Sequence, residues 1–163
     1  MLNFLQTFTQ MRYFFFFFAA LSLFLTGCKD DYLTAEEQLK VDLDKITQYI
    51  AEKNLTTEVT TSGIHYVIQT PGNGGKPSLS SSVTVHYKGY FLDGKVFDQT
   101  SGTPITFPLN GVIKGWQQCV PLLQKGGKGT FIIPSELCYG TRPPSGIPAN
   151  AVLVFDIELV DFK

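Results

Sequence analysis

Hydrophobic residues are spaced in three different ways along this chain of 163 residues, and each spacing predicts a different structure. Residues 14–25 form a short, almost continuous apolar run near the N-terminus. Residues 39–50 carry apolar side chains three or four positions apart, which is the spacing of one helix face. From Gly63 onward apolar and polar residues alternate, as they do in strands with one buried face. The chain therefore divides into an N-terminal leader, a helix and a β-rich domain.

The predicted helix extends from about Ala35 to Lys53 and begins with a capping box, in which Thr34 is the N-cap and Glu37 follows three positions later. Its apolar face, widened by Tyr49, consists of Leu39, Leu43, Ile46 and Ile50 at 4-3-4 spacing. Two interpretations of this face stay open. It packs on the domain of its own chain, which leaves a monomer, or it pairs with a second copy to form a helix-mediated dimer.

The β-rich domain follows a polar, threonine-rich joint at residues 56–62. Strands are expected at residues 64–68, 83–90, 96–98, 105–109, 129–133 and 151–160. Asp93-Gly94 predicts a hairpin turn. Residues 112–123 are the one helical segment of this region, and that helix must cross one face of the sheet. The predicted fold class is α+β, an antiparallel sheet with one short helix, preceded by an amphipathic N-terminal helix.

The apolar run near the N-terminus has the make-up of a secretory signal peptide. Arg12 supplies a positive charge before it, and the run is short for a membrane span. It ends in the sequence Leu-Thr-Gly before Cys28, which resembles the lipobox of bacterial lipoproteins, where the cysteine is acylated and becomes the mature N-terminus. We therefore expect residues 1–27 to be a lipoprotein signal peptide and Cys28 to carry lipid. An uncleaved anchor with an incidental cysteine is the alternative.

Lipid on Cys28 implies attachment to a membrane, because each buried methylene contributes about 0.8 kcal/mol. We expect residues 28–62 to form a lipidated tether and the amphipathic helix, with the protein in the bacterial cell envelope on the periplasmic face or the cell surface. Residues 29–31, Lys-Asp-Asp, resemble a surface-display signal of some lipoproteins, and a solvated tether explains them as well. Translation starts at Met1 or at Met11.

Charge and cysteine content add two constraints. The formal net charge is −1, which does not favour a nucleic-acid partner. With Cys28 assigned to lipid, Cys119 and Cys138 remain, in a compartment that permits disulfides. The sequence does not show that their Cα atoms come within about 7 Å, as a bridge requires. We expect two free, apolar core residues, and a disulfide stays open as the alternative.

Trp116 is the only tryptophan, and it follows two β-branched residues and a glycine in the segment 112–116, Val-Ile-Lys-Gly-Trp. Five other aromatic residues surround it along the chain: Tyr87, Phe97, Phe107, Tyr139 and Phe155. One large ring among scattered aromatic residues, with few charges nearby, is typical of the floor of an apolar pocket. Ordinary core packing is the alternative, since Trp and Phe are usually buried.

Six sequence blocks together resemble one family, in its order and at about its spacing. The blocks are Val85-His86-Tyr87-Lys88-Gly89, Asp93-Gly94-Lys95-Val96-Phe97-Asp98, Val112-Ile113-Lys114-Gly115-Trp116, Tyr139-Gly140, Gly146-Ile147-Pro148 and Leu153-Val154-Phe155-Asp156-Ile157-Glu158-Leu159. The chain resembles the FKBP-type peptidyl-prolyl cis/trans isomerases over about residues 62–163. The lipobox and the first helix lie outside the match and resemble the N-terminal additions of bacterial lipoprotein members.

The resemblance implies an FKBP-type isomerase domain at residues 63–163, with a five- or six-stranded antiparallel sheet wrapped around a short helix. The pocket of the family lies between helix and sheet, with the tryptophan as its floor. Carried over position by position, the pocket is lined by Tyr87, Phe97, Asp98, Phe107, Val112, Ile113, Trp116, Tyr139, Ile147 and Phe155. Phe97, Asp98 and Tyr139 are the expected catalytic residues, and the other seven bind substrate.

Polar residues of the expected pocket have specific roles. Tyr139 would donate its hydroxyl to a substrate carbonyl. Asp98 would accept a hydrogen bond or face the twisted amide, and Tyr87 would hold Asp98; a turn-capping role for Asp98 is the alternative.

Two departures from the family concern the walls of the expected pocket. Ile105 stands where many members have an aromatic residue, and the loop after Tyr139 is one residue short.

The reaction of the family is rotation about a Xaa-Pro amide, which makes no covalent bond. It therefore requires no nucleophile, metal or cofactor, and the two histidines, His65 and His86, are interpreted as ordinary strand residues.

Together with the expected lipid anchor, the resemblance implies a peptidylprolyl isomerase that accelerates the folding of exported envelope proteins. Its partners would be proline-containing polypeptides and tacrolimus-like macrolide inhibitors. A non-catalytic chaperone or peptide-binding module of the cell envelope is the alternative function. A third reading is an envelope lipoprotein whose partner docks on the apolar face of the first helix.

Overall fold

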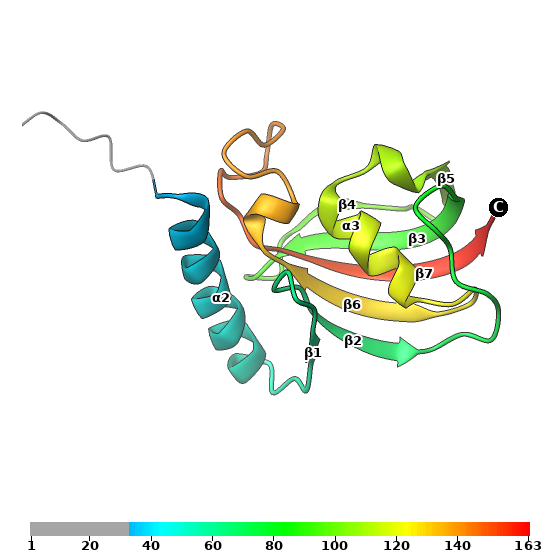
Figure 1. Ribbon diagram of the computed structural model, residues 1–163, viewed down its shortest axis with the longest axis horizontal. Coiled ribbons are helices and arrows are strands. Elements are labelled where there is room, and N and C mark those ends of the chain that lie inside the picture. Colours follow the sequence, from blue (N-terminus) through cyan, green and yellow to red (C-terminus); the bar gives the residue numbers. More distant parts are fainter. Residues whose placement is uncertain (1–32) are drawn as a thin grey trace, which may run out of the picture. The chain divides into compact units, whose positions relative to one another are not determined.

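The computed structural model describes residues 33–163 (Figure 1). The expected signal peptide, its two candidate start sites and Cys28 lie outside the described residues. None of the helices in the described part is both long enough and apolar enough to span a membrane.

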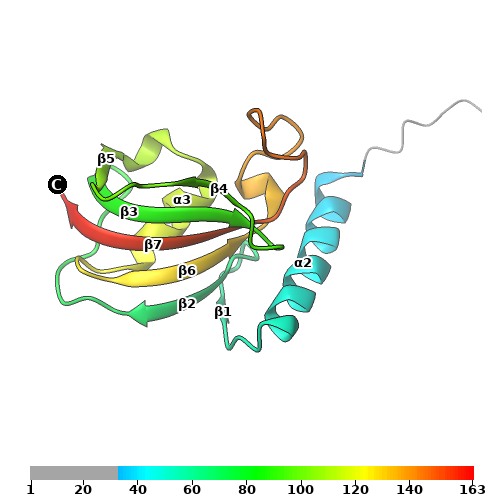
Figure 2. The same ribbon diagram turned by 180° about the vertical axis from the view of Figure 1, so that it is seen from behind.

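The described chain forms one antiparallel sheet, one long helix and one short helix (Figures 1 and 2). The helices are α2 (Ala35–Glu52) and α3 (Lys114–Cys119), and the strands are β1 (Glu58–Val59), β2 (His65–Thr70), β3 (Ser82–Phe91), β4 (Val96–Gln99), β5 (Ile105–Pro108), β6 (Lys128–Ile133) and β7 (Leu153–Phe162). Three single turns of 3₁₀ helix are η2 (Leu109–Gly111), η3 (Val120–Leu122) and η4 (Ser135–Leu137). The strand order is β1-β2-β6-β7-β3-β4, and β5 pairs with β3. The predicted α+β fold is confirmed.

Strand number is the one point at which the sheet exceeds the expectation of five or six strands. Seven strands pair, and the addition is β1, in which Glu58 and Val59 pair with Tyr66 and His65. Two residues are too few to show an alternating pattern, so this segment was expected to be part of the polar joint.

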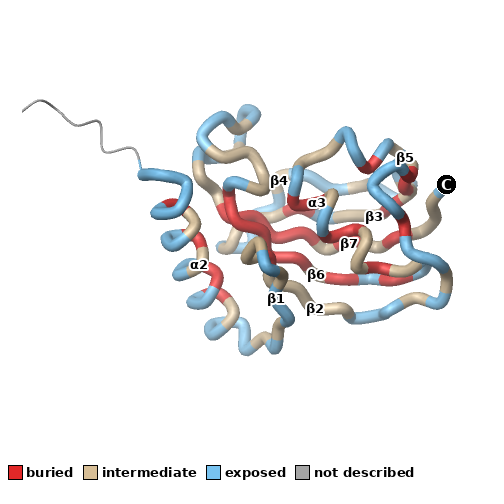
Figure 3. The backbone as a smooth tube through the Cα atoms, in the orientation of Figure 1, coloured by how far each residue is buried: buried red, intermediate tan, exposed pale blue. Residues whose placement is uncertain are grey.

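The main core lies between α3 and the face of the sheet that α3 covers (Figure 3). Alternate residues of β7 point into it, namely Leu153, Phe155, Ile157 and Leu159, each at most 3% exposed. Period-two alternation in the sequence therefore marked the buried face of this strand correctly.

Helix α3 is shorter than the helical segment predicted at residues 112–123. Val112 and Ile113 have extended ψ angles of 178° and 147° and precede the helix. Pro121, which lacks an N–H, lies in η3, where the chain leaves the α conformation. The β-branched pair is therefore extended chain that leads into the helix, and only six residues are α-helical.

Helix α2 begins with the predicted capping box. The Glu37 N–H donates to Thr34 Oγ1 at 3.2 Å, and the Thr34 N–H donates to Glu37 Oε2 at 2.8 Å. The helix packs on its own chain, at one end of the sheet face that α3 leaves uncovered (Figure 2). There Ile46 and Tyr49 form a second apolar cluster with residues of β6, β7 and the segment before β7: Ile132, Val152 and Val154.

The buried face of α2 is rotated relative to the predicted stripe. Its buried residues are Gln38, Asp42, Ile46 and Tyr49, whereas Leu39, Leu43 and Ile50 are only half-buried. Two polar residues, Gln38 and Asp42, are thus buried at positions beside the apolar stripe that the sequence predicts. Hydrogen bonds satisfy both of them, because Gln38 donates to Asp42 and Asp42 also accepts from the Ser135 N–H.

The two remaining cysteines are free, as expected. Cys119 is fully buried and Cys138 is half-buried. Burial raises the pKa of both thiols above its usual value, which keeps them protonated and unreactive near neutral pH.

Candidate functional site

An aromatic cage surrounds Trp116 on the inner face of the sheet. The ring centroid of Trp116 lies 5.2 Å from Tyr87, 5.4 Å from Phe155 and 5.6 Å from Phe107. The first two contacts are edge-to-face, at 83° and 89°, which is a favoured arrangement of aromatic quadrupoles. Phe97 extends the cage, edge-to-face on Phe155 at 5.7 Å. The rings that pack around Trp116 in the core therefore also form the wall of the expected pocket.

Two glycines allow this cage to close. A Cβ on Gly115 would lie 2.6 Å from Cγ2 of Ile133, so a side chain here would push α3 away from β6. A Cβ on Gly89 of β3 would lie 2.7 Å from Cζ of Phe97 and 2.9 Å from Cε1 of Phe155. Both positions require close approach between elements, which only glycine permits.

A hollow of about 370 Å³ opens above the cage. It is lined by Tyr87, Phe97, Asp98, Ile105, Phe107, Gly111, Val112, Ile113, Trp116, Tyr139 and Phe155. Nine of the ten residues expected from the sequence are in this lining. The tenth, Ile147, lines an adjoining hollow that shares Phe97, Asp98 and Tyr139 with the first.

Ile105 and Gly111 complete the lining. Ile105 is 42% exposed and forms the thinner wall anticipated from its position. Gly111 was missed by the sequence reasoning, because a residue without a side chain gives no apolar signal. Gln117 was missed too: its Nε2 donates to the Val112 carbonyl at 2.8 Å and holds the extended segment before α3 in place.

Few polar groups reach the hollow. The Tyr87 hydroxyl donates a short hydrogen bond to Oδ2 of Asp98, which fixes the carboxylate at the rim. The backbone of Tyr87 is itself held by Thr100, whose N–H donates to the Tyr87 carbonyl at 3.0 Å and whose Oγ1 accepts from the Tyr87 N–H at 3.1 Å. The Tyr139 hydroxyl has no hydrogen-bond partner within residues 33–163. It is therefore a donor available to a ligand.

Both phenols of the hollow stay protonated at neutral pH. Burial, followed by the hydrogen bond to the Asp98 carboxylate, raises the pKa of Tyr87 well above 10. Burial also raises the pKa of Tyr139, with smaller contributions from Cys138 and Asp98. The site is thus apolar with two neutral hydroxyl donors and one carboxylate, an arrangement that suits binding and orientation and offers no activated nucleophile.

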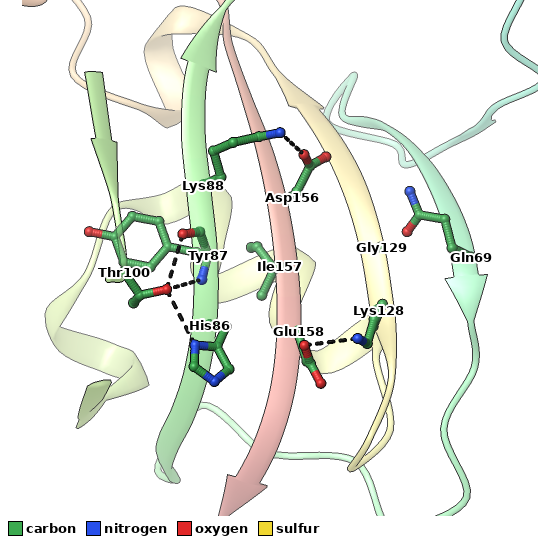
Figure 4. A pocket seen from close by; sticks show the side chains of 10 residues that line it. All are labelled: Gln69, His86, Tyr87, Lys88, Thr100, Lys128, Gly129, Asp156, Ile157 and Glu158. Atoms are coloured by element: carbon green, nitrogen blue, oxygen red, sulfur yellow. Dashed lines mark hydrogen bonds and ion pairs between the residues drawn. The ribbon is translucent and has the colours of Figure 1, made fainter. Parts of the chain in front are cut away.

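A second hollow of about 390 Å³ lies on the opposite face of the sheet (Figure 4). Two partly exposed ion pairs, Lys88–Asp156 and Lys128–Glu158, cross its floor, each at 3.0 Å. His86 lies here, 3.4 Å from Oγ1 of Thr100, and not in the aromatic cage. In the described part of the chain no group of His, Cys, Asp or Glu side chains could hold a metal ion. This face is a solvated strand surface.

Comparison with known proteins gives a consistent result. The family model described as FKBP-type peptidyl-prolyl cis-trans isomerase matches residues 74–160. The protein named FKBP-type peptidyl-prolyl cis-trans isomerase FkpA from Aeromonas hydrophila is 43% identical over 140 residues, which are 83% of this chain and 50% of that protein. FkpA from Escherichia coli K12 is 44% identical over 118 residues, 71% of this chain and 43% of that protein. The chain spans about half the length of these relatives.

Solved structures resemble the fold as well. The crystal structure of FkpA from Escherichia coli superposes with a TM-score of 0.69 at 39% identity, covering 78% of this chain and 62% of that one. A peptidyl-prolyl cis-trans isomerase from Pseudomonas syringae gives a TM-score of 0.66 at 32% identity, covering 81% of this chain and 98% of that one.

The close approach of α3 to β6 predicts the effect of Gly115→Ala. In an exposed helix this change stabilises by about 1 kcal/mol. Here the added methyl collides with Ile133, and we expect the free energy of unfolding to fall by about 1–3 kcal/mol, as in other overpacked cores. Urea denaturation measures it. Gly111→Ala is the control, since nothing lies within 4 Å of its Cβ; an equal change in both variants would contradict the packing argument.

Proposed function

We propose the function of this chain from one premise: the chain belongs to the FKBP-type peptidyl-prolyl cis-trans isomerase family. We infer that it accelerates rotation about Xaa-Pro bonds in proline-containing polypeptides. The observation that carries this inference is the hollow floored by Trp116, which is walled by aromatic rings and offers the unpaired Tyr139 hydroxyl at its edge. A prolyl ring is apolar, as the aromatic walls of this hollow are.

The reaction is limited by amide resonance, which gives an uncatalysed barrier of about 18–20 kcal/mol. Resonance places negative charge on the carbonyl oxygen, and the twisted transition state carries less charge separation than the planar amide. An apolar, water-poor hollow therefore favours the twisted state relative to water. Each 1.36 kcal/mol of this preference raises the rate about tenfold.

Each of the ten residues expected from the sequence has a part in this mechanism. Trp116 is the platform under the prolyl ring, with Tyr87, Phe107 and Phe155 as surrounding rings. Val112 and Ile113 bring the substrate backbone against it, and Ile147 borders the chain beside the proline. Phe97, Asp98 and Tyr139 act at the amide. Tyr139 donates its hydroxyl to a substrate carbonyl, and Asp98, held by Tyr87, faces the twisted amide.

The biological setting we propose is the bacterial cell envelope, where the chain, anchored by lipid on Cys28, assists the folding of exported proteins. Tacrolimus-like macrolides would fill the same hollow and inhibit. The packing of Ile46 and Tyr49 on their own sheet supports a monomer over a helix-mediated dimer, and it leaves less apolar surface for a docking partner. The alternative function is a non-catalytic chaperone that binds proline segments without accelerating their rotation.

Activity is tested with a chymotrypsin-coupled assay or exchange NMR on a Xaa-Pro peptide. We expect the wild type to accelerate exchange, and Phe97→Ala or Asp98→Val to lower kcat/KM at least about tenfold, since each removes a wall or polar contact worth about 1.4 kcal/mol or more. Leu79→Ala, which truncates an apolar side chain that is 50% exposed and outside the hollow, is the control. Peptide binding without acceleration by the wild type would favour the chaperone.

The lipid anchor is tested by labelling cells with radioactive palmitate. We expect the wild type to be labelled and to sediment with membranes, and Cys28→Ala to lose the label, because the lipobox cysteine is the acylation site. Cys138→Ala serves as the matched cysteine control. Labelling that persists in Cys28→Ala would contradict the anchor without affecting the activity proposal.

A further inference from the structure

Asp42 is a carboxylate in the interior of the protein, on a helix predicted to bury an apolar stripe. Its side chain is 0% exposed. None of the three ion pairs among residues 33–163 includes it. Burying an unpaired carboxylate is unfavourable unless hydrogen bonds replace its hydration. The partners of this carboxylate therefore indicate what it does.

Each carboxylate oxygen of Asp42 accepts one hydrogen bond. Oδ1 accepts from Nε2 of Gln38, one helical turn earlier, at 2.8 Å. Oδ2 accepts from the backbone N–H of Ser135 at 2.8 Å, which lies 93 positions later in the chain. Gln38 is itself 5% exposed, so the pair forms a buried polar contact between α2 and η4.

Ser135 begins the turn that carries Tyr139. Its carbonyl accepts from the N–H of Cys138 at 3.0 Å and from the N–H of Gly140 at 2.9 Å, one residue on each side of Tyr139. The Gly140 carbonyl then accepts from the N–H of Asn150 at 2.8 Å, which ties down the far end of the loop. Figure 1 shows this orange turn beside α2, and the two elements are in contact. Ser135 thus bonds to Asp42 through its N–H and to the backbone on both sides of Tyr139 through its carbonyl.

Backbone hydrogen bonds hold the turn together internally, and the bond from the Ser135 N–H to Asp42 ties the start of the turn to α2. Gly140 adopts a positive φ of 52°, and the residues after it form an irregular loop up to β7. Loops of this kind open locally at low free-energy cost unless their backbone groups are held. An apolar residue at position 42 would pack in the same space but would leave the Ser135 N–H unpaired.

We propose that Asp42 is a positioning residue for catalysis: through the Ser135 N–H it holds the turn that sets the place of the Tyr139 hydroxyl over the prolyl amide. The inference rests on the proposed function, because Tyr139 is the group through which Asp42 acts. Under this proposal α2 contributes to catalysis although it lies outside the aromatic cage.

The first test is kcat/KM for a Xaa-Pro peptide in Asp42 variants of the full chain. We expect Asp42→Ala to lose about tenfold, because a small displacement of an orienting donor is costly in the transition state. Asp42→Asn should recover most of the rate, since its amide oxygen still accepts from Ser135. Asp42→Leu, which fills the space, replaces Asp42→Ala if the latter does not fold.

A matched control separates positioning from stability. Ile46→Ala removes a fully buried side chain one turn along α2, which packs on the sheet and not on η4. It should lower the urea midpoint while kcat/KM, measured where the variant is folded, stays unchanged. An equal loss of kcat/KM in Ile46→Ala and Asp42→Ala would overturn the proposal.

A double-mutant cycle with Tyr139→Phe identifies the route. If Asp42 acts through Tyr139, Asp42→Ala has no further effect once the hydroxyl is gone, whereas independent effects multiply. Multiplying effects, or wild-type activity in Asp42→Ala, would overturn the inference while leaving the proposed isomerase function intact.

A spectroscopic measurement that does not depend on turnover tests the proposal even if the wild type shows no isomerase activity. The 3-fluorotyrosine signal of Tyr139, assigned by its absence in Tyr139→Phe, should be single and narrow in the wild type and in Asp42→Asn. In Asp42→Ala it should broaden or shift. An unchanged signal in Asp42→Ala would overturn the proposal whether or not the protein is an isomerase.

Discussion

Trp116 lies against the rings of Tyr87, Phe107 and Phe155, and this contact exists because Gly115 lets α3 approach β6 within the reach of Ile133. Strands β3, β4, β5 and β7 each supply one ring of the wall, and the extended segment before α3 supplies the rim. The same burial that stabilises the core keeps water from the floor of the hollow. Stability and the proposed catalysis therefore depend on one packing arrangement, and a substitution that loosens it affects both.

Polar groups are few, and each is held by another part of the chain. Asp98 is fixed by the Tyr87 hydroxyl, and Tyr87 by Thr100. Tyr139 lies on a loop that begins at Ser135, and the Ser135 N–H donates a hydrogen bond to Asp42 of α2. A reaction without bond making requires shape and orientation more than chemical reactivity, and the raised pKa values of both phenols agree with that requirement.

Sequence periodicity predicted the central strands and the aromatic residues, because both depend on local alternation or on residue type. It did not predict β1, whose two residues pair only because β2 is adjacent. It extended α3 too far, because helical spacing continues through Val112 and Pro121 although their backbones are not α-helical. It also placed the buried face of α2 on Leu39 and Leu43. The true face includes Asp42, whose partner is 93 positions away, and no local pattern reveals such a contact.

The central claim is that an apolar, preorganised hollow accelerates rotation without moving a proton. The most direct test is the catalysed cis/trans exchange rate of a Xaa-Pro peptide, measured by exchange NMR in H₂O and in D₂O. The account predicts acceleration by the same factor in both solvents, because both tyrosines of the hollow remain protonated and no bond to hydrogen changes during rotation. No acceleration, or an acceleration that falls in D₂O as general acid–base catalysis requires, would contradict it.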